Sequence, residues 1–475
     1  MAKATRRSFI RNTAVVGASN LLGVVGVSGF AGADFDVVIL GAGMAGLTAA
    51  RILAKVGPGL KVLVLEARDR VGGRMFTSTD VSVHGVELGA QVIHGSRAES
   101  WELIREYGLQ TRSLDAGGAT ESYHFLPGQP PYKPNQADLD ALYHKVVVKH
   151  AKYDGPDMSY QAFLETMSFN DTQRSALGAE ALSWSSEPGE VSARAVIDDG
   201  VAWDAYHDED FQIIGGHSLL AEKMANELEG KIQLSCAVAG LYWRSGVAGV
   251  TYIYNLQSQT VTAKRLIITL PVGVLQSQQI EVLPPFPDWK KQSIDSLQMG
   301  QAVVVAMLFN APFWSDLASG PVSWATPDGR MQFWAAHTPG EGAAAITGWF
   351  VGSAAQQLSD LGGQEGMQQV LHWLEGISGK TRLQEKLKWH RYQDWVSDPF
   401  SLGSYSFTRP GGQGAREILA RPIEKTLYFA GEATAPAPHY QTVHGAYMSG
   451  KRVAQEVSDS LDIYAEDKAI LDALF

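Results

Sequence analysis

The segment Asp34–Arg74 constrains the fold of this 475-residue chain more than any other stretch. It reads DFDVVILGAGMAGLTAARILAKVGPGLKVLVLEARDRVGGR. An apolar run leads into a glycine-rich turn, a helix of small residues follows, and a second apolar run ends in an acidic residue. This order predicts a strand, a phosphate-binding turn, a helix and a second strand, which form the start of a Rossmann-type α/β unit.

Each glycine of this turn has a distinct role in dinucleotide binding. Gly41 allows the tight turn, Gly43 lets the backbone approach a pyrophosphate, and Gly46 lets the helix pack closely on the sheet. The N-terminus of the helix offers free N–H groups and a partial positive charge to the anion. Glu66 follows Gly46 by 20 residues, where an acidic side chain accepts hydrogen bonds from a ribose hydroxyl pair.

A second glycine pair distinguishes between the dinucleotides. Gly72, Gly73 and Arg74 come a few residues after the second strand. Because two glycines with an arginine can approach a buried pyrophosphate, this group favours FAD over NAD.

Composition and charge exclude several classes of protein. The formal net charge of −11 argues against nucleic acid as a partner. Cys236 is the only cysteine, so we expect neither an intrachain disulfide nor a cysteine-based metal cluster. We expect no bound metal. The sequence carries no signal for an oligomeric state.

The N-terminus resembles an export signal. Residues 1–33 contain no acidic residue and carry Arg6 and Arg7 ahead of a mildly apolar, glycine-rich run. This pattern predicts a twin-arginine signal peptide, which the twin-arginine translocase would recognise, with removal near Ala33. The protein would then be periplasmic or secreted. The alternatives are a basic arm or a membrane anchor.

Pieces typical of nucleotide binding occur at the start, the middle and the end of the chain. We therefore predict a discontinuous, Rossmann-type (GR2-like) FAD-binding domain of residues 34–98, 210–290 and 391–475. It is interleaved with an α+β substrate-binding domain of residues 99–209 and 291–390. Helices are expected in the first part of the substrate-binding domain and a sheet in the second.

Seven motifs resemble those of the flavin-containing amine oxidase family, over about residues 34–460. They are GAGMAG, EARDRVGGR, ELGAQVIHG, LPVGVLQ, DPFSLGSYS, LYFAGE and TVHGAYMSG. ELGAQVIHG and VHGAYMSG look more like the branch of polyamine oxidases and lysine-specific histone demethylases than like monoamine oxidases. Ser404 stands where monoamine oxidases attach flavin through a cysteine, so the resemblance implies non-covalent FAD.

The resemblance also implies the contacts of the cofactor. Glu66 would hold the adenosine ribose and Arg74 the pyrophosphate side. Glu432 would bind the ribityl chain, and the amides near Val443 would favour negative charge at the pyrimidine edge of the flavin. Ala90 and Gln91 would face the flavin and Val238 the adenine. The expected cofactor-binding residues are Gly41, Gly43, Ala45, Gly46, Glu66, Ala67, Arg68, Gly73, Arg74, Gly89, Ala90, Gln91, Val238, Gly431, Glu432, Thr442 and Val443.

For the substrate, the family often frames an amine between two aromatic rings in front of the flavin. Tyr405 matches one ring, and Thr442 replaces the second, as in the demethylase branch. Trp395 is expected to pack near the flavin. His94 falls where polyamine-oxidase relatives carry a pocket histidine or acid, so we expect it to touch a substrate nitrogen.

One position departs from the family. A lysine that holds a water near flavin N5 is expected in the strand before Ala311, and Val304 takes its place. A valine neither binds that water nor stabilises developing negative charge. The substitution predicts slow reaction of the reduced flavin with oxygen, or a different oxidant.

The resemblance implies an FAD-dependent amine oxidase. It would oxidise a C–N bond of a primary or secondary amine, polyamine-like or other, to an imine and pass the electrons to O2 or another acceptor. One alternative is an L-amino-acid oxidase, which needs an arginine clamp for the carboxylate, with Arg97 as the available residue. Two others are a flavin desaturase of a specialised metabolite and a non-catalytic exported flavoprotein.

Overall fold

In the computed structural model of the chain, residues 32–80, 85–114, 121–126, 131–314, 322–337 and 344–463 are described. Apart from its last two residues, the expected export signal lies outside this part. No helix within the described part is long and apolar enough to cross a membrane.

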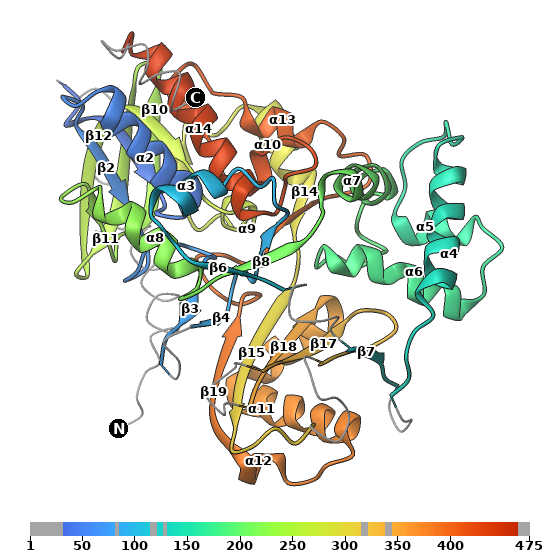
Figure 1. Ribbon diagram of the computed structural model, residues 1–475. Coiled ribbons are helices and arrows are strands. Elements are labelled where there is room, and N and C mark those ends of the chain that lie inside the picture. Colours follow the sequence, from blue (N-terminus) through green and yellow to red (C-terminus); the bar gives the residue numbers. More distant parts are fainter. Residues whose placement is uncertain are drawn as a thin grey trace.

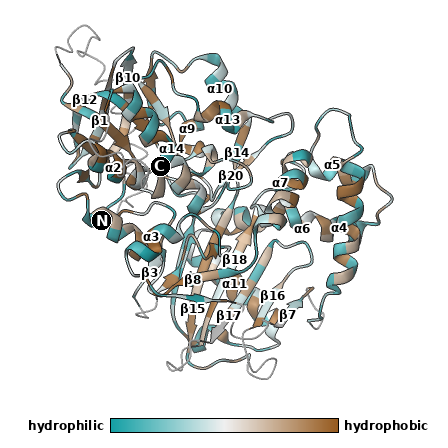
Figure 2. Cartoon of the chain, turned by 45° about the horizontal axis from the view of Figure 1, so that its top comes forward, coloured by the Kyte–Doolittle hydropathy of each residue, from teal (hydrophilic) through white to brown (hydrophobic). Residues whose placement is uncertain are grey.

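The predicted Rossmann-type unit forms the centre of an eight-stranded sheet (Figure 1). Strand β1 (Phe35–Leu40) pairs in parallel with β2 (Val62–Leu65) on one side and with β12 (Gln257–Ile268) on the other. The other strands are β9 (Ile232–Gln233), β10 (Ala237–Arg244), β11 (Val247–Tyr254), β13 (Glu281–Leu283) and β21 (Leu427–Phe429). Most of β1 and β2 is fully buried, and the strands around β1 are coloured as hydrophobic in Figure 2.

Strand β12 joins three parts of the chain. Its first half pairs antiparallel with β11, while its last residues lie between β1 and β21 in parallel register. Residues from the start, the middle and the end of the chain therefore share one sheet, as the scattered motifs predicted.

Two helices from opposite ends of the chain cover this sheet side by side, α2 (Met44–Val56) and α14 (Val443–Ser460) (Figure 1). They approach so closely that a Cβ atom at Gly450 would lie 2.7 Å from the carbonyl oxygen of Ala45. The C-terminal segment is thereby held against the glycine-rich turn.

A six-stranded sheet in the order β19-β15-β18-β17-β16-β7 forms a second body. Its strand β15 (Ala302–Phe309), which lies between β19 and β18, is completely buried apart from one residue. The other strands are β7 (Glu121–His124), β16 (Val322–Ala325), β17 (Met331–His337), β18 (Ala344–Val351) and β19 (Leu387–Asp394). The sheet expected in residues 291–390 is present.

Helix α11 (Gly352–Ser378), which covers one face of this sheet, did not follow from the alternating pattern. It contains a break at Gly362, whose φ is 77°. The glycines around this break interrupt the apolar periodicity that identifies a helix.

Four helices form a separate lobe with its own core: α4 (Gln136–His150), α5 (Tyr160–Glu165), α6 (Asp171–Ser183) and α7 (Ala193–Tyr206). Asn170 and Gln173 form a capping box at the start of α6, which satisfies two backbone donors. The helices expected at the start of the substrate-binding domain are thus present.

The mixed α/β fold is confirmed. The expected domain limits at 290/291 and 390/391 fall inside α10 (Asp288–Asp295) and β19, so the exact limits stay predictions.

A substitution at Gly450 tests the packing of α14 on α2, and one at Gly376 serves as its control. Gly450→Ala places a Cβ atom 2.7 Å from Ala45, so we expect a loss of about 1–3 kcal/mol in the free energy of unfolding. Gly376→Ala on α11 is the matched control, because a Cβ atom there meets nothing within 4 Å. It should stabilise the protein by about 0.5–1 kcal/mol through helix propensity. Urea unfolding measures both, and equal effects would contradict this account of the contact.

Candidate functional site

A cavity of about 1570 Å³ lies where the two sheets and the helical lobe meet. Pockets for small ligands usually measure about 300–1,000 Å³, so this cavity has room for a dinucleotide and a second molecule. All expected cofactor-binding residues except Gly46 line it, and so do His94, Trp395, Tyr405 and Thr442. The structure brings these residues together, while their contacts with a cofactor or substrate stay predictions.

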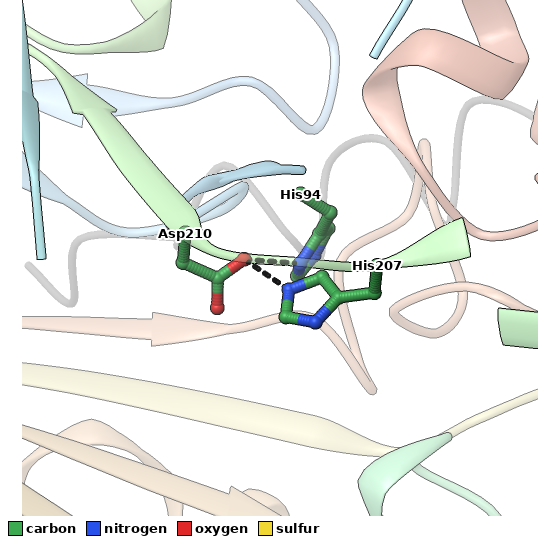
Figure 3. A group of neighbouring side chains, drawn as sticks. All are labelled: His94, His207 and Asp210. Carbon is green, nitrogen blue, oxygen red and sulfur yellow. Dashed lines mark hydrogen bonds and ion pairs between the residues drawn. The ribbon is translucent and has the colours of Figure 1, made fainter. Parts of the chain in front are cut away.

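His94 lies on β5 (Ile93–His94), at the end of the cavity near the helical lobe. Its Nδ1 is 3.0 Å from Oδ1 of Asp210, which is its direct partner on β8 (Asp210–Ile213). His207 reaches the same carboxylate oxygen, as Figure 3 shows. Because Asp210 orients the His94 ring, a defined edge of that ring is available to the cavity.

An aromatic wall forms at this end. Tyr405 stacks on Trp349 at a centroid distance of 6.5 Å, and Trp349 lies 6.5 Å from Trp334. The hydroxyl of Tyr405 donates to the carbonyl of Ser183 at 3.0 Å, and burial raises the pKa of Tyr405 to about 12. The two tryptophans were not singled out from the sequence, although strand alternation in β17 and β18 puts both on the face opposite the core.

Trp395 lines the cavity beside this wall, and Val304 is buried next to it. The indole N–H of Trp395 donates to the carbonyl of Leu88 at 2.8 Å, so the ring is fixed at the cavity surface. Val304 has no exposed surface and packs against Trp395 and Leu88. Contrary to expectation, Val304 itself does not line the cavity, because its strand neighbours Trp349 and Gln393 do so in its place.

The helical lobe contributes a carboxylate that sequence reasoning missed. Glu180 and Ser183 of α6 and Trp184, which follows it, line the cavity together with Gly200 and Trp203 of α7. Burial raises the pKa of Glu180 to about 7, Asp204 adds to this rise, and a hydrogen bond from Trp184 opposes it. No motif surrounds Glu180, so only the folded lobe reveals its position.

Arg97, the expected carboxylate clamp, is not among the cavity residues. Its guanidinium is exposed, donates to the carbonyls of Ala205 and Tyr206, and lies over the Tyr206 ring. An amino-acid carboxylate in the cavity would not meet it.

At the opposite end, two glycine loops lie against each other. The amide of Gly72 donates to the carbonyl of Ala42 at 2.8 Å, and Gly73 approaches Gly43 closely. A Cβ atom at Gly46 would lie 2.0 Å from the carbonyl oxygen of Gly41, while one at Gly43 would meet nothing within 4 Å. Gly46 therefore serves helix packing, and Gly43 leaves space for a phosphate.

Glu66 is 5% exposed and held by backbone amides. Its Oε2 accepts from Ala42 and its Oε1 from Arg68, both at 2.8 Å. Burial raises the pKa of Glu66, and these two donors oppose the rise. A carboxylate has about four lone-pair sites, so acceptor capacity remains for a ribose hydroxyl pair.

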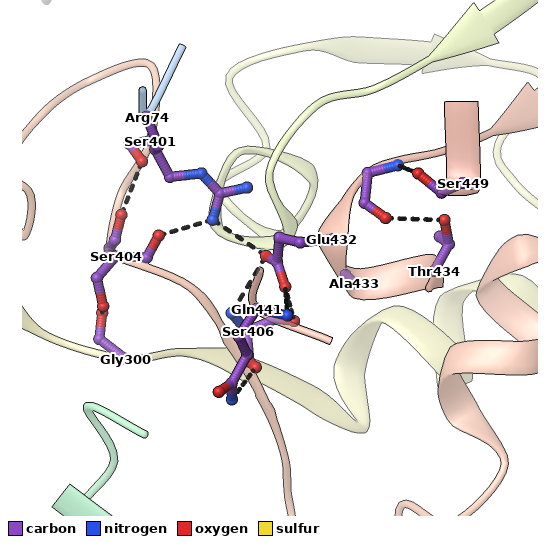
Figure 4. A network of polar contacts seen from close by, with 12 residues as sticks. Arg74, Gly300, Ser401, Ser404, Ser406, Glu432, Ala433, Thr434, Gln441 and Ser449 are labelled. Atoms are coloured by element: carbon purple, nitrogen blue, oxygen red, sulfur yellow. Dashed lines mark hydrogen bonds and ion pairs between the residues drawn. The ribbon is translucent and has the colours of Figure 1, made fainter. Parts of the chain in front are cut away.

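Glu432 is the centre of a polar network that joins distant segments (Figure 4). It accepts from Nη1 of Arg74 at 3.0 Å, from Oγ of Ser406 at 2.8 Å and from the amide of Gln441 at 3.2 Å. Arg74 also donates to the carbonyl of Ser404 at 2.6 Å. Glu432 and Arg74 thus hold the cavity wall in place in addition to facing the cavity.

The N-terminus of α14 opens onto the cavity at Val443. Oγ1 of Thr442 accepts from the amide of Gly445 at 2.9 Å and donates to the carbonyl of His439 at 2.8 Å. The hydroxyl of Thr442 is therefore used by the helix cap. The partial positive charge of the helix end favours an anionic group in front of Val443.

Known proteins share this sequence pattern and fold. A family model described as "Flavin containing amine oxidoreductase" matches residues 44–458. The human lysine-specific histone demethylase 2 is 29% identical over 89% of this chain and 53% of its own length. Polyamine oxidase 4 of Oryza sativa subsp. japonica is 28% identical over 89% of this chain and 88% of its own length.

This chain spans only part of the length of several of its demethylase relatives. The lysine-specific histone demethylase 1 homolog 3 of Arabidopsis thaliana is 28% identical over 90% of this chain, which spans 30% of that protein. Among solved structures, putrescine oxidase bound to putrescine superposes with a TM-score of 0.75 at 23% identity, covering 90% of this chain and 99% of that chain.

The family model spans most of the chain. The glycine loops, Glu66 at the expected ribose position and the N-terminus of α14 at Val443 all line one cavity, as the binding of FAD requires. The protein therefore belongs to the flavin-containing amine oxidase family, with FAD as its cofactor.

Proposed function

We propose that the protein is an FAD-dependent amine oxidase that converts a C–N bond of a primary or secondary amine to an imine, with O2 or another acceptor as the oxidant. One observation carries this proposal. The cavity continues past the end that fits a dinucleotide into a chamber lined by Tyr405, Trp349, His94 and Glu180. Bound FAD supplies the hydride acceptor, and the chain supplies orientation and electrostatics.

The residues around the chamber suit an amine. The ring faces of Tyr405 and Trp349 attract a cation and exclude water from its surroundings. His94, oriented by Asp210, can accept a proton or a hydrogen bond from the substrate nitrogen. The end of α14 at Val443 stabilises negative charge beside it.

The L-amino-acid oxidase alternative lacks support, because Arg97 lies outside the cavity. Non-covalent FAD is supported by Ser404, whose hydroxyl donates to the carbonyl of Gly300. The single cysteine, Cys236, lies beside Glu66 at the ribose end of the cavity, and burial raises the pKa of its thiol to about 11.

We further infer export through the twin-arginine translocase to the periplasm or beyond. The support is the sequence of residues 1–33, with its paired arginines and absence of acidic residues.

Anaerobic flavin bleaching tests the activity. We expect polyamines or monoamines to bleach the flavin absorbance and amino acids to leave it unchanged. Tyr405→Ala should lower the rate constant of bleaching about 2- to 30-fold through loss of the cation–π contact, while Tyr405→Phe retains it. If no amine and no amino acid bleaches the flavin, the non-catalytic flavoprotein is favoured. If amino acids alone bleach it, an L-amino-acid oxidase is favoured.

Glu180 predicts a preference for substrates with a second ammonium group. Glu180→Gln keeps the shape of the side chain and removes its charge, so kcat/KM for putrescine should fall about tenfold or more. Butylamine, which has no second ammonium, is the matched substrate and should change little. Since the carboxyl ionises above a pKa of about 7, the preference should be full above pH 7 and fade as the pH falls through 7. Equal losses for both amines would contradict this role.

Val304 predicts slow oxidation of the reduced flavin by oxygen. In stopped-flow experiments we expect reoxidation in air to be slower than turnover with an artificial quinone acceptor. Val304→Lys should accelerate reoxidation, and Val304→Met controls for the added bulk in this buried position. Reoxidation in air that matches turnover, and does not change in Val304→Lys, would show the prediction to be wrong.

A further inference from the structure

Two histidines and one aspartate converge beside the amine chamber. Nδ1 of His94 and Nε2 of His207 each lie 3.0 Å from Oδ1 of Asp210. Figure 3 shows both rings directed at this one carboxylate. The three donor atoms all lie within 4.8 Å of one another. The sequence suggested no metal site here, because His94 lies 116 residues before Asp210, and His207 and Asp210 alone form no recognised metal motif.

The backbone and a neighbouring ring hold the three side chains in place. His94 and Asp210 are direct partners across the pair of strands β5 and β8, and His207 caps the end of α7. Trp203 stacks on His207 at a centroid distance of 5.6 Å and meets the His94 ring edge to face at 5.2 Å. The donors are therefore arranged before any ligand binds, which favours a precise site.

Two imidazoles and one carboxylate are a common ligand set for zinc, with a fourth position left open. Zinc binds such ligands at about 2.0–2.2 Å, which places tetrahedral donors about 3.3–3.6 Å apart. Each histidine nitrogen lies 3.0 Å from Oδ1 of Asp210, and all three donors lie within 4.8 Å of one another, so side-chain rotations that replace the two hydrogen bonds can bring them to this spacing. The side chains of His94, His207 and Asp210 are 37%, 29% and 33% exposed, so an ion can reach them.

The charge around the group also suits a cation. Within the described part of the chain, Asp210 forms ion pairs with these two histidines alone. Two further acidic residues, Asp208 and Glu209, directly precede it. A cation that binds replaces the two hydrogen bonds of Asp210 to His94 and His207, while no lysine or arginine ion pair with Asp210 in the described residues has to break.

A second group of donors, Glu99, His439 and His444, differs in these respects. Nδ1 of His439 and Nε2 of His444 bond to each other at 3.2 Å, and His444 is 2% exposed. Burial, followed by the nearby His439 and His94, lowers the pKa of His444 to about 3. Because His444 is almost fully buried, an ion cannot reach this group as it can reach the partly exposed first group, so this group is excluded.

We propose that His94, His207 and Asp210 bind a divalent transition-metal ion of the zinc class at the edge of the amine chamber. Such an ion would bind Nδ1 of His94, the only one of the three ligands that lines the cavity, and place a charge beside the chamber. Zinc should therefore inhibit amine oxidation reversibly. This inhibition rests on the proposed function, whereas the binding itself does not.

Zinc retention by the holoprotein tests the site. The protein is treated with EDTA, transferred to metal-free buffer at pH 8, titrated with ZnCl2 by calorimetry and assayed for zinc after gel filtration. We expect one zinc per chain. His207→Phe keeps a ring against Trp203 and removes the donor, so it should weaken binding at least tenfold. His390→Phe, at an exposed histidine on β19, is the matched control and should bind as the wild type does.

Two further conditions sharpen the test. Affinity should fall at pH 5, because protons compete for the imidazole nitrogens, and MgCl2 should not replace zinc, because it prefers an all-oxygen octahedron. A wild-type protein that retains no zinc, or a His207→Phe variant that retains as much as the wild type, would overturn the site.

The inhibition is read separately. Zinc should slow anaerobic flavin bleaching by amine in the wild type, and His207→Phe should need at least tenfold more zinc for the same effect. If zinc binds through His207 but bleaching is unchanged, the effect on the chamber is refuted. If no amine bleaches the flavin, zinc retention still decides the site, so failure of the proposed function stays distinguishable.

Discussion

The close contact between α2 and α14 is the constraint on which the cavity depends. At Gly450 the two backbones approach so near that a Cβ atom would meet the carbonyl of Ala45. Because α14 follows the loop that carries Glu432, this contact places the C-terminal segment against the first strand and turn of the chain. The cavity lies along that junction, with the helix end at Val443 as part of its wall.

Backbone groups line one end of the cavity and side chains line the other. Backbone dominates the nucleotide end, where Gly43 leaves room for close approach, Gly72 and Gly73 pack tightly against their neighbours, and Glu66 is fixed by amides. Side chains dominate the amine end, where Tyr405, Trp349 and Glu180 come from three separate elements. A phosphate needs many N–H donors at short range, whereas an organic cation needs ring faces and a carboxylate.

Much of the nucleotide end could be predicted from sequence because its spacing is local. The run from Phe35 to Glu66 forms one strand, turn, helix and strand, and each residue has its role relative to near neighbours. The amine end resisted prediction because Trp349, Glu180 and His207 have no motif around them. Val304 shows the same limit: its place in the strand was inferred, but its position behind Trp349 and Gln393 became visible only in the sheet.

By itself the sequence determined the nucleotide-binding unit, the family and the scattered order of the FAD-binding segments, because glycine turns and apolar strands are encoded over short distances. Only the tertiary structure decided which side chains share the amine chamber, that Arg97 lies outside it, and that His94, His207 and Asp210 meet. Apart from the pair His207 and Asp210, those contacts join residues far apart in the chain, and their geometry depends on how β5, β8 and α7 pack.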